Sequence, residues 1–332
     1  MTNPTEDPVM QVHEDAAAFL YPAALRAAAL LEVADHLAAG PRDVFELADL
    51  TGTNGPYLRR LLRFLASRGT FREDGEGRFH LTPKADALRA DVPRSARAGV
   101  LTVTAALWWL PAHDLVEAVR TGEPSFDRHY GQPFFAHLID NPGDSAMFAA
   151  GMASFSAGQL EQIVAAYDFP ATGVVVDVGG GVGGLLRAVL RARPGLRGVL
   201  FDQETVLADN VLGDVDGWTA EPGDFFTSVP AADLHLVKNV LHDWNDEQCM
   251  RILANCRKAL RPGGKVLVME AVLPPANEPD FARTLDMIMM MMLPGQERTR
   301  AEYEPLFEGA GLRVNRVWPT AGMMSVIEAE PA

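Results

Sequence analysis

The sequence predicts an α/β protein in which a smaller, mainly helical domain precedes an open sheet with crossover helices. The chain has 332 residues, which is more than one ordinary hydrophobic core organises. Apolar residues recur at helical spacing over residues 16–91, whereas short β-branched runs alternate with helical stretches beyond Thr172. We therefore expect two domains, at residues 1–105 and 106–332.

The first domain has the pattern of a winged helix. "LRAAALLEVADHLAAGP" (25–41) predicts one helix that ends at the Gly-Pro pair, and residues 44–52 and 55–69 predict two shorter helices. Residues 70–82 predict a hairpin around an Asp-Gly pair. Such modules often bind DNA, but the only basic cluster here, three arginines within residues 59–63, is explained by a solvated helix face.

Composition narrows the class of partner. A net charge of -15 argues against nucleic acid, because phosphate backbones need a basic face. The apolar stretches are too short for a bilayer span and the N-terminus lacks the pattern of a secretory signal, so we expect a cytoplasmic protein. Cys249 and Cys256 form no metal-type pair, so we expect reduced structural thiols and no metal site. A small molecule or a second copy of the chain is the expected partner.

Four β-branched runs predict the parallel strands of the second domain. They are "GVVVDVGG" (173–180), "LRGVLFDQ" (196–203), "ADLHLVKNV" (232–240) and "GKVLVMEAV" (264–272), with helical stretches between them. Ligands of such sheets bind at the carboxyl ends of the strands, where the motifs described next are found.

The first motif, "DVGGGVGG" (177–184), predicts a glycine turn that lets backbone approach a ligand. The turn around Gly179 and Gly181 fits both a dinucleotide site and a site for S-adenosylmethionine. Asp177 favours S-adenosylmethionine, since a carboxylate repels pyrophosphate and suits a cationic methionine moiety. In both interpretations Asp202, at the end of the next strand, binds ribose hydroxyls.

Two further segments follow later strands. Asp224 and Phe225 come after a short strand, where a carboxylate can accept from the adenine amine and an aromatic ring can pack on the base; an ordinary loop would also explain them. His242 lies just past the strand at 232–240, where it is either a catalytic base or a polar strand-end residue. Asn245 or Asp246 is expected to cap the helix that follows.

The order of several motifs resembles the small-molecule O-methyltransferases, the caffeate-type plant enzymes and their bacterial polyketide-tailoring relatives. The motifs are "DVGGGVGG", "LFDQETV", "GDFF", "KNVLHDWNDEQ", "LRPGGKVLVMEAVLP" and "PGQERT". The resemblance implies a Rossmann-like S-adenosylmethionine methyltransferase domain and an N-terminal winged-helix dimerisation domain. It implies Lys238 near the cofactor, and His242 as general base with Glu270 and Glu297 holding its imidazole.

The resemblance also suggests the walls of the site. In "LDMIMMMML" (285–293) it favours Met289 as a substrate-pocket residue, although Met side chains equally fill irregular cores. In "MFAAGMASFSAGQ" it suggests Met152 in the pocket and Ser156 near the methionine carboxylate of the cofactor. Trp108 and Trp109 could line either the pocket or the dimer interface.

The first helix has more apolar positions than a small module can bury. We therefore expect Leu25, Ala28, Leu31 and Val33 at a two-fold interface.

The sequence thus predicts a homodimeric S-adenosylmethionine-dependent O-methyltransferase that acts on a phenolic or related aromatic hydroxyl. A phenol titrates near 10, so a neutral histidine beside it can take the proton as the methyl moves. Two alternatives stay open: a relative that keeps the cofactor for hydroxylation or decarboxylation, and a winged-helix regulator that senses a small ligand.

Overall fold

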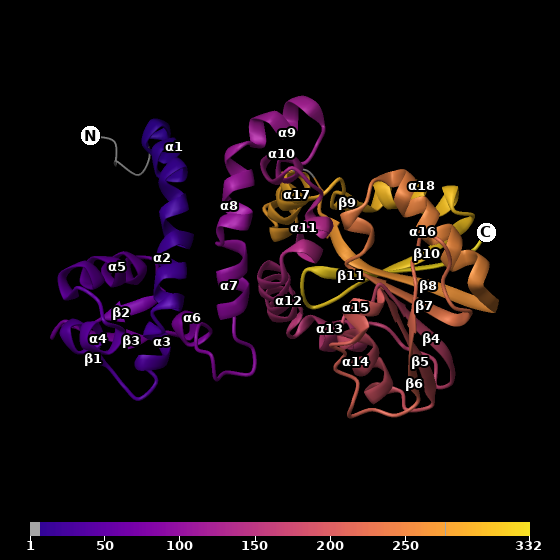
Figure 1. Cartoon of the computed structure of the whole chain (residues 1–332), viewed down its shortest axis with the longest axis horizontal. Helices are drawn as coiled ribbons and strands as arrows, with labels where there is room; N and C mark the ends of the chain where they lie inside the picture. Colours follow the sequence, from indigo (N-terminus) through magenta and orange to yellow (C-terminus); the bar gives the residue numbers. More distant parts are fainter. Residues whose placement is uncertain (1–6, 276) are drawn as a thin grey trace. The chain divides into compact units, whose positions relative to one another are not determined.

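The computed structural model describes residues 7–275 and 277–332 and divides into two compact units (Figure 1). Within the described chain, the first unit comprises residues 7–110 and 138–157, and the second comprises 111–137 and the residues from Gly158 onward. The chain thus leaves the first unit close to the predicted boundary at 105 and 106. The return of residues 138–157 to the first unit was not anticipated from the sequence.

The first unit is mainly helical. Its elements are α1 (Pro8–Ala16), η2 (Ala17–Phe19), α2 (Leu20–Leu30), α3 (Val33–His36), β1 (Arg42–Asp43), α4 (Val44–Thr51), α5 (Gly55–Ser67), β2 (Phe71–Glu73), β3 (Arg78–Leu81), α6 (Pro83–Asp86), α7 (Arg97–Val103) and α12 (Pro142–Ser156). Helices α8 (Ala106–His113) and α11 (Phe134–Asp140) contain two of the three points at which the chain passes between the units, and the third follows α12.

Helices α4 and α5 with the β2–β3 hairpin form the expected winged helix, to which β1 adds a third strand beside β3. Asp43 begins α4 with a reciprocal capping box that includes Glu46, and Asn54 caps α5. The prediction of one helix over residues 25–41 was wrong. The helix breaks after Leu30, because Glu32 takes a left-handed conformation with φ of 53°, and its carboxylate accepts a hydrogen bond from Arg97 at 2.7 Å.

Two of the four residues expected at a two-fold interface are buried within their own unit instead. Ala28 and Val33 are buried in the core of their own unit, and Leu25 and Leu31 pack against that core. A small module can therefore bury these positions, because α4, α5 and the hairpin cover them. The exposed apolar side chains of α1, η2 and α2 are Val9, Met10, Val12, Phe19, Leu20 and Leu30.

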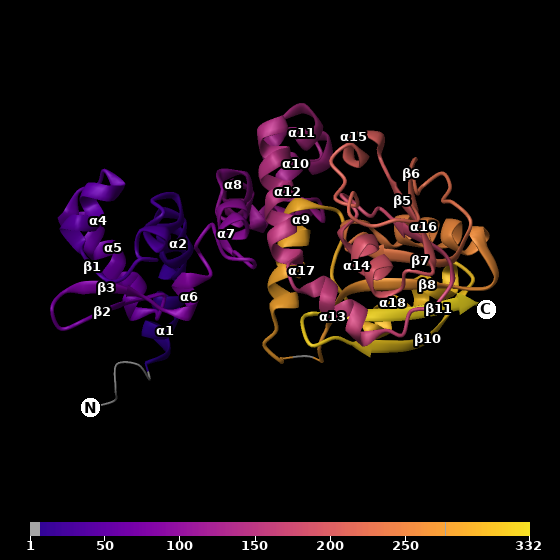
Figure 2. The same cartoon turned by 90° about the horizontal axis from the view of Figure 1, so that it is seen from below.

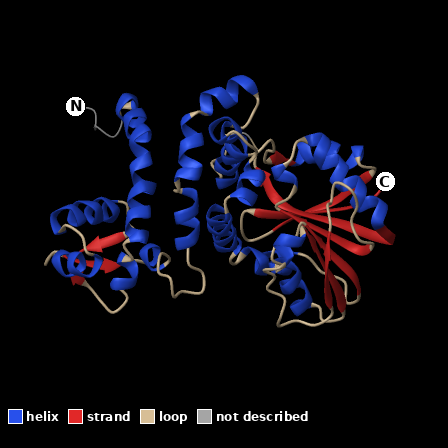
Figure 3. Cartoon of the chain, in the orientation of Figure 1, coloured by secondary structure: helices blue, strands red, loops and turns tan. Residues whose placement is uncertain are grey.

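The second unit is an α/β domain, whose strands are drawn in red in Figure 3. Its helices are α9 (Leu115–Thr121), α10 (Ser125–Tyr130), α13 (Gln159–Ala166), α14 (Gly184–Ala192), α15 (Glu204–Leu207), η3 (Leu241–Asp243), α16 (Asp246–Ala259), α17 (Phe281–Met292) and α18 (Arg300–Gly309). Its strands are β4 (Gly173–Val178), β5 (Leu196–Asp202), β6 (Trp218–Pro222), β7 (Ala232–Lys238), β8 (Leu260–Leu273), β9 (Arg298–Thr299), β10 (Leu312–Pro319) and β11 (Met324–Pro331).

The main sheet has the strand order β10-β11-β8-β7-β4-β5-β6. The strands from β8 to β6 pair in parallel, as the alternating pattern predicted. Strands β11 and β10 extend the sheet antiparallel at one edge, which the sequence analysis did not predict (Figure 2). Strands β5 and β6 follow β4 on one side of it, and β7 and β8 are added on the other side. The turns after β4 and β7 therefore lie side by side at the carboxyl edge, where such sheets bind ligands.

Successive residues of β4 face opposite layers. Val174, Val176 and Val178 belong to a core shared with α16 and α18, whereas Val175 belongs to a core shared with α13 and α14. Both faces of the sheet are therefore covered, which explains why its strands are apolar runs without polar alternation. This rigid three-layer support holds the loops at the carboxyl edge in place.

Within residues 7–275 and 277–332, no helix is both long and apolar enough to cross a membrane. Cys249 and Cys256 are buried free thiols, as expected.

Candidate active site

Three loops meet at the carboxyl edge of the sheet. Gly179, after β4, has φ of 65°, and a Cβ added there would lie 2.9 Å from Val240 Cγ2 and 3.4 Å from Phe225 Cε1. The turn after β4, the loop after β6 and the loop after β7 are thus in contact through a position that only glycine fits. The structure thereby brings Phe225 and Gly179 together, as expected for two walls of one site.

Asp202 faces the glycine turn from the end of β5. Its Oδ2 accepts a hydrogen bond from the Gly181 amide at 2.8 Å, and its Oδ1 accepts from the Gln203 amide at 2.7 Å. Each carboxylate oxygen has two lone pairs, so both can still accept from a diol. Burial raises the pKa of Asp202, while the two amide donors act against that rise. The arrangement fits the ribose of S-adenosylmethionine.

Asp177 and Lys238 end the adjacent strands β4 and β7 below the glycine turn. Asp177 is buried, and its Oδ2 accepts from the Leu186 amide at 3.2 Å, which attaches α14 to β4. Burial raises the pKa of Asp177 to about 7. Burial also lowers the pKa of Lys238, and the carboxylates of Glu270 and Asp177 oppose that change. When it is ionised, the Asp177 carboxylate suits a cationic ligand such as a sulfonium.

Asp224 folds its own loop. Its Oδ1 accepts from the Phe226 amide at 2.8 Å and its Oδ2 from the Thr227 hydroxyl at 3.1 Å. The adjacent Phe225 carbonyl accepts from the Asn255 side chain of α16 at 2.9 Å. These bonds fix the loop that carries Phe225, and they leave acceptor capacity on the exposed Asp224 carboxylate.

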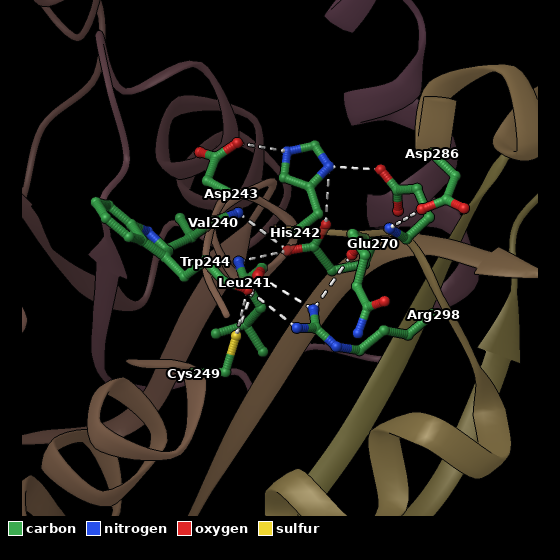
Figure 4. Close-up of polar contacts among 11 residues, drawn as sticks. Val240, Leu241, His242, Asp243, Trp244, Cys249, Glu270, Asp286 and Arg298 are labelled. Carbon is green, nitrogen blue, oxygen red and sulfur yellow. Dashed lines mark hydrogen bonds and ion pairs between the residues drawn. The ribbon is translucent and has the colours of Figure 1, made fainter. Parts of the chain in front are cut away.

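His242 lies in η3, directly after β7, and is buried at the centre of an acidic cluster (Figure 4). Its Nδ1 is 2.6 Å from Glu297 Oε1, a hydrogen bond across 55 residues of sequence. Its Nε2 is 3.4 Å from Asp243 Oδ1. In the neutral ring, the close bond to Glu297 keeps the proton on Nδ1 and leaves Nε2 as the nitrogen that can accept another.

Glu270, in β8, holds the histidine loop more than the ring. Its Oε1 accepts from the amides of Val240 at 3.0 Å and Leu241 at 2.9 Å. Its Oε2 lies 3.7 Å from His242 Nδ1 and has no hydrogen-bond partner among the described residues. Glu297 and Glu270 therefore have different roles, one on the imidazole and the other chiefly on the backbone that presents it.

Burial and neighbouring charges shift the pKa values of His242 and of the carboxylates around it. Burial alone lowers the pKa of His242, but the surrounding carboxylates of Glu270, Asp243 and Glu297 outweigh it and raise the pKa to about 10. Burial raises the pKa of Asp243 to about 6 and that of Glu270 to about 7.

Ligand atoms of His242, Glu270 and Glu297 lie within 4.8 Å of one another and could hold a metal ion. The hydrogen bonds already described account for that proximity without one.

Sequence reasoning missed four residues around His242. Asp243 lies beside Nε2, and Asp286 of α17 accepts from the Glu297 amide at 2.9 Å. Gly295 permits close contact between loops, because a Cβ there would overlap the His242 carbonyl oxygen. Arg298 is a fully buried cation next to Glu297. Two of them, Gly295 and Arg298, belong to "PGQERT", but a motif does not reveal which of its residues are buried.

Of the remaining predicted site residues, some lie in the first unit and some in the second. Met289 is buried on α17 in the second unit. Met152 and Ser156 are half-buried on α12 in the first unit. Of the tryptophans on α8, Trp108 is buried and Trp109 is exposed. Asn245 caps α16 by accepting from the Gln248 amide, whereas the Asp246 side chain binds Arg298.

Comparison with known families agrees with this arrangement. Residues 112–313 match the family model of the O-methyltransferase domain, and residues 14–91 match that of the O-methyltransferase dimerisation domain. The dimerisation domain implies a homodimer.

Individual relatives cover nearly the whole chain. Phenazine O-methyltransferase PhzM of Lysobacter antibioticus is 39% identical over 92% of this chain and 92% of its own length. CalO1, a methyltransferase in calicheamicin biosynthesis solved in its SAH-bound form, is 44% identical with a TM-score of 0.91 over 98% of both chains. NcsB1, an O-methyltransferase from neocarzinostatin biosynthesis solved with S-adenosylmethionine and 2-hydroxy-5-methyl naphthoic acid, is 35% identical with a TM-score of 0.77 over 94% of this chain and 96% of its own.

These matches decide between the two ligands that fit the glycine turn. S-adenosylmethionine is the cofactor, and the dinucleotide interpretation is set aside. The chain belongs to the family of small-molecule O-methyltransferases with an N-terminal dimerisation domain, and it is an S-adenosylmethionine-dependent O-methyltransferase of secondary metabolites.

Proposed function

We propose that the enzyme methylates a phenolic or related aromatic hydroxyl of a small molecule, with His242 as the general base. The observation that carries the proposal is the hydrogen bond of 2.6 Å between His242 Nδ1 and Glu297, which fixes the tautomer and leaves Nε2 to take the proton. Glu297 also stabilises the imidazolium that forms. Glu270 holds the loop through the amides of Val240 and Leu241.

The charge of the cluster suits this chemistry. Bound S-adenosylmethionine supplies an activated methyl group and a positive charge. A positive charge beside His242 lowers its pKa from the value of about 10 that the carboxylates impose, and so increases the neutral fraction that can accept a proton. The three surrounding carboxylates then stabilise the ring once it is protonated. Accurate placement of the acceptor oxygen supplies much of the remaining acceleration.

The other site residues keep the roles that the motifs and the family resemblance assign to them. Asp202 binds the ribose hydroxyls, Asp224 and Phe225 bind the adenine, and Gly179 and Gly181 give the turn its close approach. We assign Asp177 to the methionine moiety, Lys238 to a position near the cofactor, and Ser156 to the methionine carboxylate. Met152 and Met289 are assigned to the substrate pocket.

Two observations support an aromatic acceptor: the compounds that the relatives' names contain, and the methionine side chains of α17. The names of the relatives include a phenazine and a naphthoic acid, both flat aromatic compounds. Met289 belongs to a methionine-rich helix, and thioethers adapt to flat rings. Transfer of labelled methyl from S-adenosylmethionine should therefore occur to members of a panel of hydroxylated phenazines, naphthoates and simple phenols. Transfer only to aliphatic alcohols or to amines would contradict the proposal.

We further propose that dimerisation uses the exposed apolar side chains of α1, η2 and α2 defined above. Phe19 and Leu20 are 61% and 49% exposed, and Leu30 is 56% exposed, in a domain that matches a dimerisation model. Replacing Phe19 and Leu30 together by Asp should yield monomers in light scattering. The same exchange at Val116 and Val119, exposed apolar residues of α9, is the matched control and should leave the dimer intact.

A further inference from the structure

Arg298 is a buried cation that the chemistry described so far does not use. It is 0% exposed, and it directly follows Glu297 in the chain. Its Nε and Nη2 donate to Asp246 Oδ1 at 3.1 and 2.7 Å, and its Nη2 also donates to the Trp244 carbonyl at 3.0 Å. Its Nη1 donates to the Leu241 carbonyl at 3.3 Å. The guanidinium thus binds acceptors on both sides of His242 in the sequence.

The loop that contains His242 is also held through its main-chain amides. The Glu270 carboxylate accepts from the amides of Val240 and Leu241, and the Cys249 thiol donates to the Leu241 carbonyl at 3.1 Å. The loop begins at Asn239, whose φ of 51° lies in the left-handed region. A sharply turned segment is therefore fixed by one buried anion at its amides and one buried cation at its carbonyls, as Figure 4 shows.

Arg298 and Glu297 are consecutive in the chain, so the contacts of one limit where the other can lie. A rotation of the segment that contains both residues would move the Glu297 carboxylate and the guanidinium together. Asp286 accepts from the Glu297 amide, so the segment is anchored on its other side as well. One side chain therefore connects the segment that carries His242 to the segment that carries its partner.

We propose that Arg298 is a positioning residue that fixes His242 and Glu297 relative to one another. The inference rests on the proposed role of His242 as general base. A planar guanidinium reaches Leu241, Trp244 and Asp246 at once, which a lysine ammonium cannot do with the same geometry. Well-packed apolar side chains often stabilise a fold as much as a buried ion pair does, so stability alone does not require a cation here.

The test is a double-mutant cycle with His242. Arg298→Met should lower kcat by about 30-fold to 100-fold, the order expected when a reacting group is displaced by about 1 Å, and leave the dissociation constant of S-adenosylmethionine within about twofold. In the His242→Ala background the same change should cause almost no further loss, because the residue acts through the ring. Arg193→Met is the control: Arg193 also binds a backbone carbonyl, that of Phe169, and a carboxylate, that of Asp168, but away from the site.

A second variant covers the case in which Arg298→Met does not fold. Asp246 is 59% exposed, so Asp246→Ala removes the acceptor of two guanidinium bonds at little risk to the core. It should lower kcat by about threefold to tenfold, again with almost no further loss in the His242→Ala background. Losses that multiply with that of His242→Ala, or near-normal kcat in both variants, would overturn the positioning role while the base role stands. Near-normal turnover by His242→Ala alone would overturn the base role first.

Discussion

The glycine turn after β4 and the histidine loop after β7 lie side by side on the same sheet, yet they are built differently. The turn is shaped by backbone: Gly179 and Gly181 have φ of 65° and 58°, and the Asp202 carboxylate accepts from main-chain amides. The loop is shaped by side-chain charge: His242 depends on Glu297 for its ring and on Glu270 for its backbone. Under the proposed function, cofactor binding thus depends on local geometry, and catalysis on contacts between distant segments.

This difference predicts that substitutions in the two regions change different quantities, namely cofactor affinity and kcat. A change in the turn should weaken the binding of S-adenosylmethionine and spare the chemistry at saturation. A change in the histidine cluster should lower kcat and spare cofactor binding. The following predictions separate the two regions, in order of decreasing effect.

The largest effect should follow loss of the base. His242→Ala should lower kcat by about 100-fold to 10,000-fold at neutral pH, the usual range for a general base, while the dissociation constant of S-adenosylmethionine stays nearly unchanged. Single-turnover kinetics and calorimetry on the same preparation measure both quantities. A parallel loss of cofactor binding would mean that the two regions are not separate.

A smaller effect, on binding alone, should follow from the turn. Asp202→Ala removes a charged acceptor, so it should weaken S-adenosylmethionine by about 1.5 to 3 kcal/mol in calorimetry. At saturating cofactor its kcat should remain close to that of the wild type. Asp214→Ala, which removes a surface partner of Arg187, is the matched control and should bind the cofactor normally.

The charge of Glu297 should have a moderate effect with a recognisable sign. Glu297→Gln keeps an acceptor for His242 Nδ1 but removes one of the charges that raise the pKa of the ring. It should lower kcat by about tenfold, less than His242→Ala does, and move the rising limb of the pH–rate profile to lower pH. Glu328→Gln, a buried carboxylate that binds Tyr167, should change neither quantity. A limb that moves to higher pH would contradict the electrostatic account.

The sequence predicted the turn better than the loop, for a physical reason. Glycine spacing and the acidic end of the next strand are local signals, so Gly179, Gly181 and Asp202 could be placed by pattern alone. Glu270 and Glu297 were found only through family resemblance, because nothing local distinguishes them from surface carboxylates. Arg298 was not found, since its burial depends on how β9 packs.

The fold shows the same limit. The parallel strands β4, β5, β7 and β8 were predicted from their β-branched runs, and the winged helix from its helical patterns and hairpin. The break at Glu32 has no glycine or proline to announce it, and it coincides with a hydrogen bond to Arg97, far along the chain. The return of residues 138–157 to the first unit depends on packing against α7, where Gly151 allows close approach to Thr102. Tertiary contacts decide such features.

An effect of a different kind, on stability and not on binding or rate, should follow from the pKa of His242. The folded pKa of His242, about 10, lies above its usual value of 6.5, so the protonated ring stabilises the folded state. That stabilisation is fully present below pH 6.5 and is lost as pH rises through 10. Urea unfolding should show the free energy of unfolding falling more steeply over this range in the wild type than in His242→Ala. Parallel curves would show that the ring is not held as an imidazolium in the free enzyme.

The pH dependence of kcat in His242→Ala, measured against the wild type with the true acceptor and saturating S-adenosylmethionine, tests the base role most directly. A phenol that ionises in solvent no longer needs the base, so the variant should gain activity steadily toward about pH 10. The wild type should level off earlier, because the charged cofactor lowers the pKa of the ring, and the difference between the two enzymes should shrink. Near-normal turnover by His242→Ala at neutral pH, or a deficit that stays constant to pH 10, would contradict the account.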